Sequence, residues 1–315
     1  MVYILFIVGF VFLIYGANFL VDGAASLAKK FKISNIVIGL TIVALGTSSP
    51  ELVVNLIASF QDSEDVALGN ILGSNISNIL LILGVSSLIF PLTVNNNTLW
   101  KEVPLSLLAA LVLAITSNDI ILDGHGASFI TRSDGVILIL FFLLFMYYAF
   151  SIAKKADNQD FNIKTFTVKR SVIMVLAGIT GLILGGNWIV DGAVKIASYL
   201  GMSESVISLT IIAIGTSLPE LATCVVAAIK KNSDIVIGNV IGSNIFNVFF
   251  VLGVSAVIKP LPFNPDLNFD VIAGIIAVFL LFAFLLMPRK KLLERWQGGI
   301  LLILYVSYIV VLIIK

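Results

Sequence analysis

The segment LTIVALGTSSPELVVNLIAS, from Leu40 to Ser59, carries a threonine, two serines, a proline and a glutamate in the middle of an apolar run. The chain repeats it as LTIIAIGTSLPELATCVVAA, from Leu209 to Ala228. A carboxylate inside a long apolar segment is costly unless it has a partner or a function. Because the pattern occurs twice, we take it as the feature that decides the fold.

The repeat extends well beyond this motif. Residues 18–92 align with residues 187–261 without a gap, and 35 of these 75 positions are identical, including NxxVDGA, GNxxGSNIxN and LGVS. A constant offset of 169 residues relates the two copies. Internal similarity of this kind indicates a duplicated structural unit.

The composition is that of an integral membrane protein. Of the 315 residues, 59% are hydrophobic and 12% are charged, and the mean hydropathy is +1.10. A soluble domain carries roughly a quarter charged residues. The single cysteine and the single histidine exclude a disulfide framework and give no zinc-binding cluster.

Ten apolar runs are long enough to cross a bilayer, since a spanning helix needs about 20 residues. They cover approximately residues 2–28, 35–59, 66–90, 102–118, 134–153, 171–199, 205–229, 235–258, 269–287 and 296–314. We therefore predict an all-α membrane protein with ten transmembrane helices. The first run and run 171–199 exceed the hydrocarbon core of about 30 Å, so we expect these helices to be tilted or to project beyond it.

Lysine and arginine are unevenly distributed over the predicted connections. Only Arg132, Lys259 and Lys315 belong to one set of connections and termini, and Lys195 lies within a span. The other set holds Lys29, Lys30, Lys32, Lys101, Lys154, Lys155, Lys164, Lys169, Arg170, Lys230, Lys231, Arg289, Lys290, Lys291 and Arg295. Because cytoplasmic loops carry the basic excess, we predict a multi-pass plasma-membrane protein with both termini extracellular.

Each copy of the repeat belongs to a set of five predicted spans. Five is an odd number, so the two copies cross the membrane in opposite directions. We predict a first five-helix repeat over residues 1–153, a cytoplasmic linker over 154–170 and a second five-helix repeat over 171–315. Inverted-topology repeats are typical of secondary transporters, whose site lies near the midplane between the repeats.

Glu51 and Glu220 lie near the middle of their predicted spans. Thr47 and Thr216 precede them by four residues, so each threonine shares a helix face with its glutamate. The next predicted helix of each copy carries a polar stripe at four-residue spacing. The two stripes are Asn70, Ser74 and Asn78 in the first copy, and Asn239, Ser243 and Asn247 in the second.

Backbone oxygens are also expected at this depth. Pro50 and Pro219 have no N–H and crowd the carbonyl four residues earlier, near Gly46 and Gly215. The carbonyls of Ala44 and Ala213 lie one turn before Ser48 and Ser217. Open backbone at membrane depth is tolerated only where it lines a cavity.

These candidate ligands are all oxygens, which hard cations prefer. Ca²⁺ takes six to eight oxygen ligands, whereas zinc or copper favours histidine or cysteine. Two glutamates match the charge of one Ca²⁺, and the same cluster suits Na⁺ ions. A site at which one ion excludes the other is the minimum requirement for antiport.

The doubled GTSxPEL and GNxxGSNIxN motifs resemble the paired alpha-repeats of the calcium:cation antiporter superfamily, and within it the prokaryotic-type sodium/calcium exchangers. The resemblance covers essentially the whole chain. It implies ten helices in an inverted five-plus-five arrangement, with four ion sites between the second, third, seventh and eighth helices. It also implies that the long first and sixth helices slide across this core during alternating access.

Carried over to this chain, the resemblance implies a set of ion ligands. The calcium site would use Glu51, Glu220, Thr47 and Thr216. The sodium sites would add Ser48, Ser217, Ser74, Ser243 and the carbonyls of Ala44 and Ala213, with Asn78 and Asn247 facing the middle of the cluster.

Two departures from related families matter. Potassium-dependent exchangers and some archaeal relatives have Asp at the position of Asn247. With Asn in both copies the core carries a charge of −2 rather than −3, which argues against K⁺ co-transport. The linker of 17 residues, 154–170, also leaves no place for the large cytosolic calcium-sensing region of animal exchangers.

The sequence thus predicts a secondary active antiporter that exchanges Na⁺ for Ca²⁺, which is not an enzyme and has no cofactor. Its expected partners are the two transported ions and the bilayer, not nucleic acid. The alternative is a proton-coupled Ca²⁺/cation exchanger on the same scaffold, although the hydroxyls beside each glutamate favour Na⁺. An intramembrane hydrolase using Ser48 and Glu51 lacks a base for the serine. A channel would not need one occluded site.

Overall fold

The computed structural model describes residues 2–60, 64–119, 124, 128–153, 165–199, 213–287 and 291–314. Within these ranges the chain is almost entirely helical, with four strands of two residues each. Most of the predicted linker and the first part of the predicted span 205–229 lie outside the described residues. So do the basic residues Lys154, Lys155, Lys164, Arg289, Lys290 and Lys315.

The first part of the chain begins with the long helix α1 (Val2–Phe31). A bent helix follows, formed by α2 (Asn35–Ile38), η1 (Gly39–Val43), α3 (Ala44–Thr47) and α4 (Ser49–Phe60). The remaining helices of this part are α5 (Glu64–Ser77), η2 (Asn78–Ile82), α6 (Leu83–Ile89), η3 (Thr98–Glu102), α7 (Val103–Thr116) and α9 (Arg132–Ile152). The segments η1, η2 and η3 are π-helical.

The second part of the chain repeats this order. It begins with the long helix α10 (Val168–Tyr199). The helices after it are α12 (Ala213–Thr216), α13 (Leu218–Ile229), α14 (Ser233–Phe246), η5 (Asn247–Leu252), α15 (Gly253–Ile258), η6 (Pro265–Leu267), α16 (Asn268–Leu286) and α17 (Arg295–Ile314). Here η5 is π-helical and η6 is a single 3₁₀ turn.

Eight described helices are long and apolar enough to cross a membrane, and there are nine if the bent pair 35–47 and 49–60 counts as one span. They match nine of the ten predicted runs. The tenth, 205–229, is described only from residue 213, and its apolar helix Leu218–Ile229 is shorter. The predicted span 102–118 begins earlier, with residues 96 and 97 already helical, because the Asn95 side chain accepts a hydrogen bond from the Thr98 N–H at 2.9 Å and caps the helix.

Two small antiparallel ribbons join the connections between helices, and the all-α prediction did not include them. The strand β1 (Leu92–Thr93) pairs with β4 (Leu292–Leu293). The strand β2 (Phe129–Ile130) pairs with β3 (Leu261–Pro262). Each ribbon ties a connection of the first part of the chain to one of the second.

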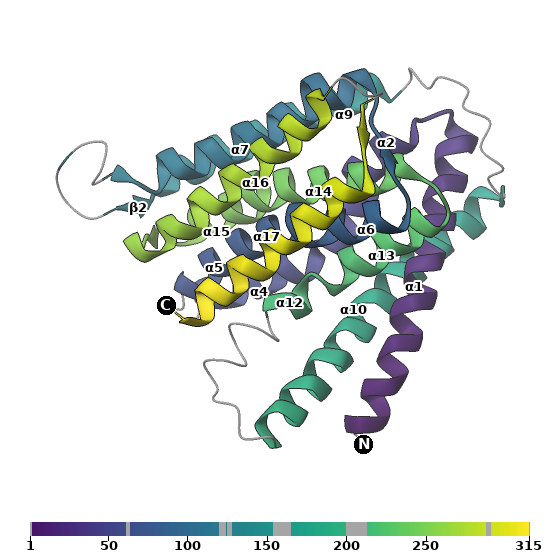
Figure 1. The fold of residues 1–315 in the computed structure, drawn as a ribbon, viewed down its shortest axis with the longest axis horizontal. Coiled ribbons are helices and arrows are strands. Elements are labelled where there is room, and N and C mark those ends of the chain that lie inside the picture. The colour runs from purple at the N-terminus through teal and green to yellow at the C-terminus, as the bar shows by residue number, and fades with distance from the viewer. Residues whose placement is uncertain are drawn as a thin grey trace.

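The helices α1 and α10 lie side by side, and their lower ends extend away from the other labelled helices (Figure 1). Glycine allows their close approach. A Cβ atom at Gly178 would lie 2.6 Å from the backbone nitrogen of Leu20. These two helices, the longest of those described, thus form a tightly packed pair.

The helices that carry the repeated GNxxGSNIxN motif form the centre of the bundle. The apolar window of span 233–258 is 94% buried and that of span 65–89 is 72% buried, whereas those of α9 and α17 are each 28% buried. Helices α9 and α17 therefore belong to the perimeter.

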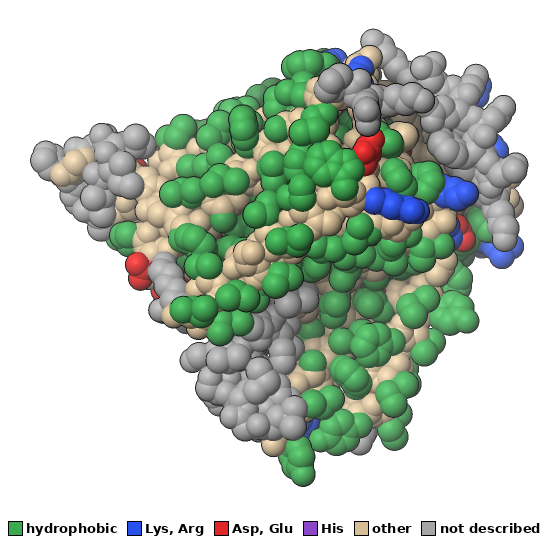
Figure 2. Space-filling view, viewed as in Figure 1, with side chains coloured by type: hydrophobic (Ala, Val, Ile, Leu, Met, Phe, Trp, Pro, Cys, Tyr) green, Lys and Arg blue, Asp and Glu red, His purple; other side chains and the backbone are tan. Residues whose placement is uncertain are grey.

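The perimeter is apolar. Leu144 of α9 and Ile303 of α17 are 63% and 67% exposed. Figure 2 shows hydrophobic side chains over most of the visible face, and most of the visible basic side chains gather toward one end. An apolar surface of this extent around a bundle of spanning helices is that of a multi-pass membrane protein.

Candidate cation site

Each copy of the GTSxPE motif forms a broken helix. In the first copy, Ser48 lies between α3 and α4 with φ −83° and ψ 9°, and the two halves are bent by 45°. In the second copy, Ser217 lies between α12 and α13 with nearly the same angles, φ −84° and ψ 2°. Pro50 and Pro219 fit the first turn of the new helix, where no N–H is needed. The break thus falls between the threonine and the glutamate of each motif.

The hydroxyls of each broken helix reach the Asn/Ser helix of the other copy. Thr47 Oγ1 donates to Asn239 Oδ1 at 3.1 Å, and Thr216 Oγ1 donates to Asn70 Oδ1 at 3.2 Å. Adding or subtracting the offset of 169 residues converts one of these bonds into the other. Each broken helix is therefore hydrogen-bonded to the Asn/Ser helix of the other part of the chain.

The serines that follow connect to both carboxylates. Ser48 Oγ lies 2.9 Å from Ser243 Oγ and donates to Glu220 Oε1 at 2.9 Å. On the related side, Ser74 Oγ lies 3.5 Å from Ser217 Oγ and donates to Glu51 Oε1 at 3.5 Å.

The two carboxyl groups share one environment. Glu51 and Glu220 are each 1% exposed, and they are close enough for their charges to interact. Within the described part of the chain, neither forms an ion pair with a lysine or arginine. Two buried acids without a basic partner need a cation or a proton.

Four asparagines join the two central helices. Asn78 Nδ2 donates to Asn244 Oδ1 at 2.9 Å, and Asn247 Nδ2 donates to Asn75 Oδ1 at 3.1 Å. Asn78 and Asn247 each begin a π-helical segment, η2 and η5. Such π-bulges occur often at functional sites.

One set of oxygens in this cluster is left without a donor. The set consists of Glu51 Oε2, Glu220 Oε2, Asn78 Oδ1 and Asn247 Oδ1, which are buried and have no hydrogen-bond partner among the described residues. Their four residues are each 1% exposed. Buried acceptors without donors are rare in folded proteins. A pair of carboxylate and amide oxygens from each copy, all acceptors only, is the arrangement that a bound cation satisfies.

The carbonyls of Ala44 and Ala213 are the two backbone ligands that the sequence predicts. The Ala44 carbonyl accepts from the Ser48 N–H at 2.9 Å and from Thr47 Oγ1 at 3.3 Å, so it is hydrogen-bonded rather than bare. The corresponding Ala213 begins the described part of its helix.

Other polar residues extend the cluster beyond those that we predicted as ligands. Asn75 and Asn244 pair across the centre, since the side-chain amide of each also donates to the backbone carbonyl of the other. The distances are 3.4 Å from Asn75 to the Asn244 carbonyl and 3.3 Å from Asn244 to the Asn75 carbonyl. Asn70 donates to Asn55 at 3.5 Å, and Asn239 donates to Cys224 at 3.3 Å. Asn55 and Cys224 occupy equivalent positions, four residues after each glutamate.

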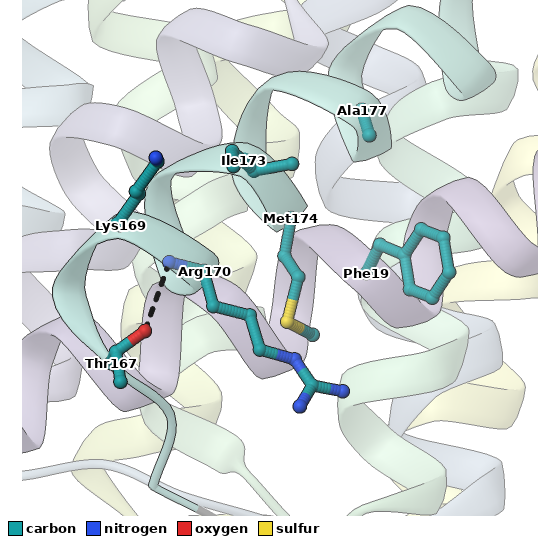
Figure 3. A pocket seen from close by; sticks show the side chains of 7 residues that line it. All are labelled: Phe19, Thr167, Lys169, Arg170, Ile173, Met174 and Ala177. Atoms are coloured by element: carbon teal, nitrogen blue, oxygen red, sulfur yellow. Dashed lines mark hydrogen bonds between the residues drawn. The ribbon is translucent and has the colours of Figure 1, made fainter.

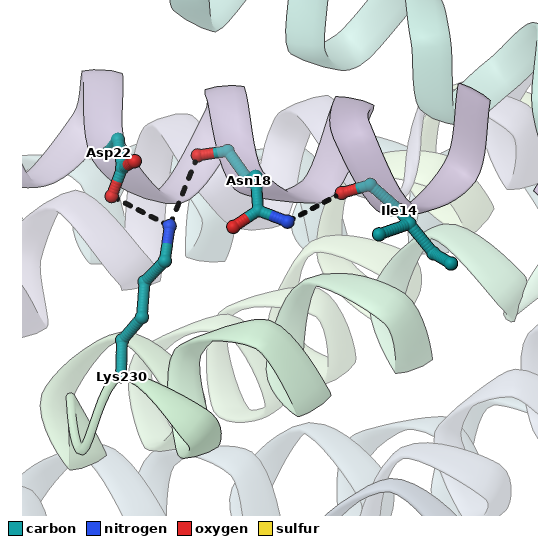
Figure 4. Close-up of polar contacts among 4 residues, drawn as sticks. All are labelled: Ile14, Asn18, Asp22 and Lys230. Carbon is teal, nitrogen blue, oxygen red and sulfur yellow. Dashed lines mark hydrogen bonds and ion pairs between the residues drawn. The ribbon is translucent and has the colours of Figure 1, made fainter. Parts of the chain in front are cut away.

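An ion pair links α1 to the end of α13. Lys230 Nζ lies 2.7 Å from Asp22 Oδ1 and 3.5 Å from the Asn18 carbonyl (Figure 4). The equivalent of Lys230 in the first copy is Gln61, so the sequence provides this ion pair on one side only.

A separate open groove of about 410 Å³ lies at the start of α10 (Figure 3). It is lined by Phe19, Thr167, Lys169, Arg170, Ile173, Met174 and Ala177. Its charged side chains are basic and none belongs to the central cluster, so this groove does not suit a cation.

A helical membrane protein with a buried, duplicated cluster of carboxylate, amide and hydroxyl oxygens has the features of a cation transporter. The chain is a member of the sodium/calcium exchanger protein family, whose model matches residues 1–151 and 170–314. It is therefore a membrane antiporter of the cation/Ca²⁺ exchange type.

Named relatives agree with this membership. The chain is 37% identical over 311 residues to the inner membrane protein YrbG of Escherichia coli K12, covering 94% of this chain and 92% of the relative. It is 29% identical over 343 residues to the sodium/calcium exchanger MaX1 of Methanosarcina acetivorans, covering 98% of each. A solved structure of the sodium-calcium exchanger NCX_Mj matches with a TM-score of 0.85 and 33% identity, covering 98% of this chain and 99% of that one.

Proposed function

We propose that the protein exchanges Na⁺ for Ca²⁺ across the cell membrane by alternating access, with ten transmembrane helices in two inverted repeats. The repeats are residues 1–153 and 171–315, joined by a cytoplasmic linker over 154–170, and both termini are extracellular. The paired hydrogen bonds support this arrangement, because an offset of 169 residues relates the bonds of Thr47 and Asn78 to those of Thr216 and Asn247. Bonds related in this way are what a pseudo-twofold axis between the repeats produces.

The observation that carries the proposal is the set of four unpartnered oxygens on Glu51, Glu220, Asn78 and Asn247, found among the described residues. Ca²⁺ would bind between the two carboxylates, whose combined charge of −2 it neutralises, with Thr47 and Thr216 beside it. Na⁺ ions would bind to the same carboxylates together with Ser48, Ser74, Ser217 and Ser243, and the carbonyls of Ala44 and Ala213. Because both kinds of ion need the same two carboxylates, occupancy by one excludes the other.

The hydroxyl and amide oxygens around the carboxylates support Na⁺ rather than H⁺ as the coupling ion. A proton needs only the carboxylate that it binds, whereas Na⁺ needs a shell of several oxygens. Ser48 and Ser243 are fully buried and lie beside Glu220, where they can supply such a shell. The name of the relative MaX1, a sodium/calcium exchanger, supports the same choice.

Access to the site would alternate through movement of α1 and α10 relative to the central helices. The two helices pack closely on each other, and α1 also packs on α13, which carries Glu220. A Cβ atom at Gly186 of α10 would lie 3.8 Å from the ring of Pro219, which is an ordinary contact distance. The pair thus lies against the broken helix of the site.

Uptake of ⁴⁵Ca²⁺ into proteoliposomes tests the coupling ion. We expect an outward Na⁺ gradient at equal pH on both sides to drive uptake, and a pH gradient without Na⁺ to drive none. Uptake driven by the pH gradient alone would replace Na⁺ with H⁺ in the proposal. Absence of uptake under either gradient would contradict antiport of Ca²⁺.

A further inference from the structure

A second group of buried polar side chains lies on the helix formed by η3 and α7. Thr98, Glu102 and Ser106 are 1%, 0% and 2% exposed. Thr98 Oγ1, Glu102 Oε2 and Ser106 Oγ have no hydrogen-bond partner in the described part of the chain. Unpartnered polar atoms so deeply buried need an explanation, because leaving them unpaired costs free energy.

Glu102 is the charged member of this group. Its Oε1 accepts a hydrogen bond from the Tyr148 hydroxyl of α9, and the Thr98 hydroxyl lies beside the carboxyl group. The neighbouring Lys101 does not form an ion pair with it, and its ammonium lies over the Tyr148 ring, 5.8 Å from the centroid.

A second acid lies on the helix that packs against α7. Asp234, in the first turn of α14, interacts electrostatically with Glu102, and α14 packs against α7. No ion pair to either acid occurs among the described residues. Two acids and two hydroxyl groups therefore lie on helices that pack against one another, and Lys101, whose charge acts on Glu102, forms no ion pair with either acid among the described residues.

This group is separate from the central cluster. Neither Glu102 nor Asp234 contacts Glu51 or Glu220 through any hydrogen bond found among the described residues. Ser106 continues the group inward, where it lines a cavity of about 20 Å³ together with Asn75 and Asn244. The polar face of α7 is thus directed toward the core and not toward lipid.

We propose that Glu102, Asp234 and Thr98 form a second binding site for a divalent cation. Two carboxylates supply a charge of −2, and their oxygens with the Thr98 hydroxyl are hard ligands of the kind that Ca²⁺ prefers. Asp234 is only partly buried, so water completes the coordination shell from its side. The basic residues Lys101, Lys230 and Lys231 precede these acids in the chain, which places the site at the cytoplasmic end in the proposed orientation.

Equilibrium binding of ⁴⁵Ca²⁺ to the purified full chain in detergent and in the absence of Na⁺ tests this proposal. We expect two Ca²⁺ per chain in the unmodified protein, one in the Glu51→Gln/Glu220→Gln variant and one in Glu102→Gln. Combining all three changes should abolish binding. Loss of one buried carboxylate should weaken the second site by at least about tenfold.

Two further variants keep the result interpretable. Asp234→Asn should also remove one Ca²⁺, and because Asp234 is partly exposed this change tests the site even where Glu102→Gln does not fold. Glu294→Gln changes an acid that instead accepts from Trp296 and should leave both ions bound. A stoichiometry of one in the unmodified chain that only Glu51→Gln/Glu220→Gln removes would overturn the second site. A stoichiometry unchanged by Glu51→Gln/Glu220→Gln would instead contradict the proposed central site.

Discussion

The hydroxyl of Ser48 provides a sharp test of how the central cluster holds its ions. Ser48 is fully buried, its Oγ donates to Glu220 Oε1 at 2.9 Å, and it lies 2.9 Å from Ser243 Oγ. Ser48→Ala removes a hydrogen bond to a carboxylate in a place where no solvent can replace it. Such bonds contribute about 1.5–3 kcal/mol, which corresponds to a loss of about 10- to 150-fold in ion affinity. We therefore expect the Na⁺ concentration for half-maximal activation to rise by at least about tenfold.

The chain offers two matched controls for this change. Ser49 is adjacent, but its hydroxyl donates to the Leu45 carbonyl at 2.7 Å and does not reach the carboxylates. Ser217 is the equivalent of Ser48 in the second copy, and its hydroxyl lies 3.5 Å from that of Ser74. In Na⁺ titrations of ⁴⁵Ca²⁺ uptake, Ser49→Ala should need the same Na⁺ concentration for half-maximal activation as the unmodified protein. Ser217→Ala should need a concentration between those of Ser49→Ala and Ser48→Ala. Equal Na⁺ activation of Ser48→Ala and Ser49→Ala would refute the reasoning.

Three other changes test the packing and the polar contacts around the site. Gly178→Ala would place a methyl group 2.6 Å from the Leu20 nitrogen, and such overpacking should lower the free energy of unfolding by about 1–3 kcal/mol. Gly299→Ala is the control, because no atom lies within 4 Å of the Cβ position at Gly299, and it should leave the midpoint of thermal denaturation unchanged. Equal midpoints for Gly178→Ala and Gly299→Ala would contradict the close approach of α1 and α10. Asn244→Ala leaves the Asn78 amide and the Asn75 carbonyl without their Asn244 partners, so the free energy of unfolding should fall by about 1–3 kcal/mol in thermal denaturation. An unchanged free energy of unfolding would mean that the asparagine contacts are dispensable for stability. Lys230→Ala breaks an ion pair whose side chains are 30% and 37% exposed. It should therefore change the free energy of unfolding by no more than about 1 kcal/mol, and a larger loss in the same denaturation assay would show that the contact between α1 and α13 depends on this pair.

The sequence was sufficient to predict the duplication and the helices that carry the cluster. The identical GTSxPE and GNxxGSNIxN motifs, repeated at a fixed offset, identified Glu51, Ser74 and their equivalents. Helical periodicity then assigned Thr47 to the face of Glu51. Helix-forming runs and local spacing are short-range features, which is why they can be read from one sequence.

The contacts across the two copies could not be predicted in the same way. The bond from Ser48 to Glu220 joins residues 172 positions apart, and no local spacing encodes it. Asn75 recurs in both motifs, yet it lies one position after Ser74 and therefore on another face of an ideal helix. The structure uses that second face for pairing with Asn244.

Departures from ideal helix geometry and from exact repetition hid other features. The π-helical segments that begin at Asn78 and Asn247 shift the positions that follow them, and neither has a clear sequence signal. Asn55 and Cys224 occupy equivalent positions with different side chains, so a comparison based on identity passes over them. The helix that contains Glu102 begins earlier than its apolar run, because Asn95 caps it.

The central claim is that one carboxylate from each copy holds the same Ca²⁺, and its most direct test is Na⁺-driven ⁴⁵Ca²⁺ uptake into proteoliposomes by Glu51→Gln and by Glu220→Gln. Each change halves the charge at the ion, so we expect each single variant to lose uptake, while Glu294→Gln retains it. Full uptake by either Glu51→Gln or Glu220→Gln would contradict a shared site.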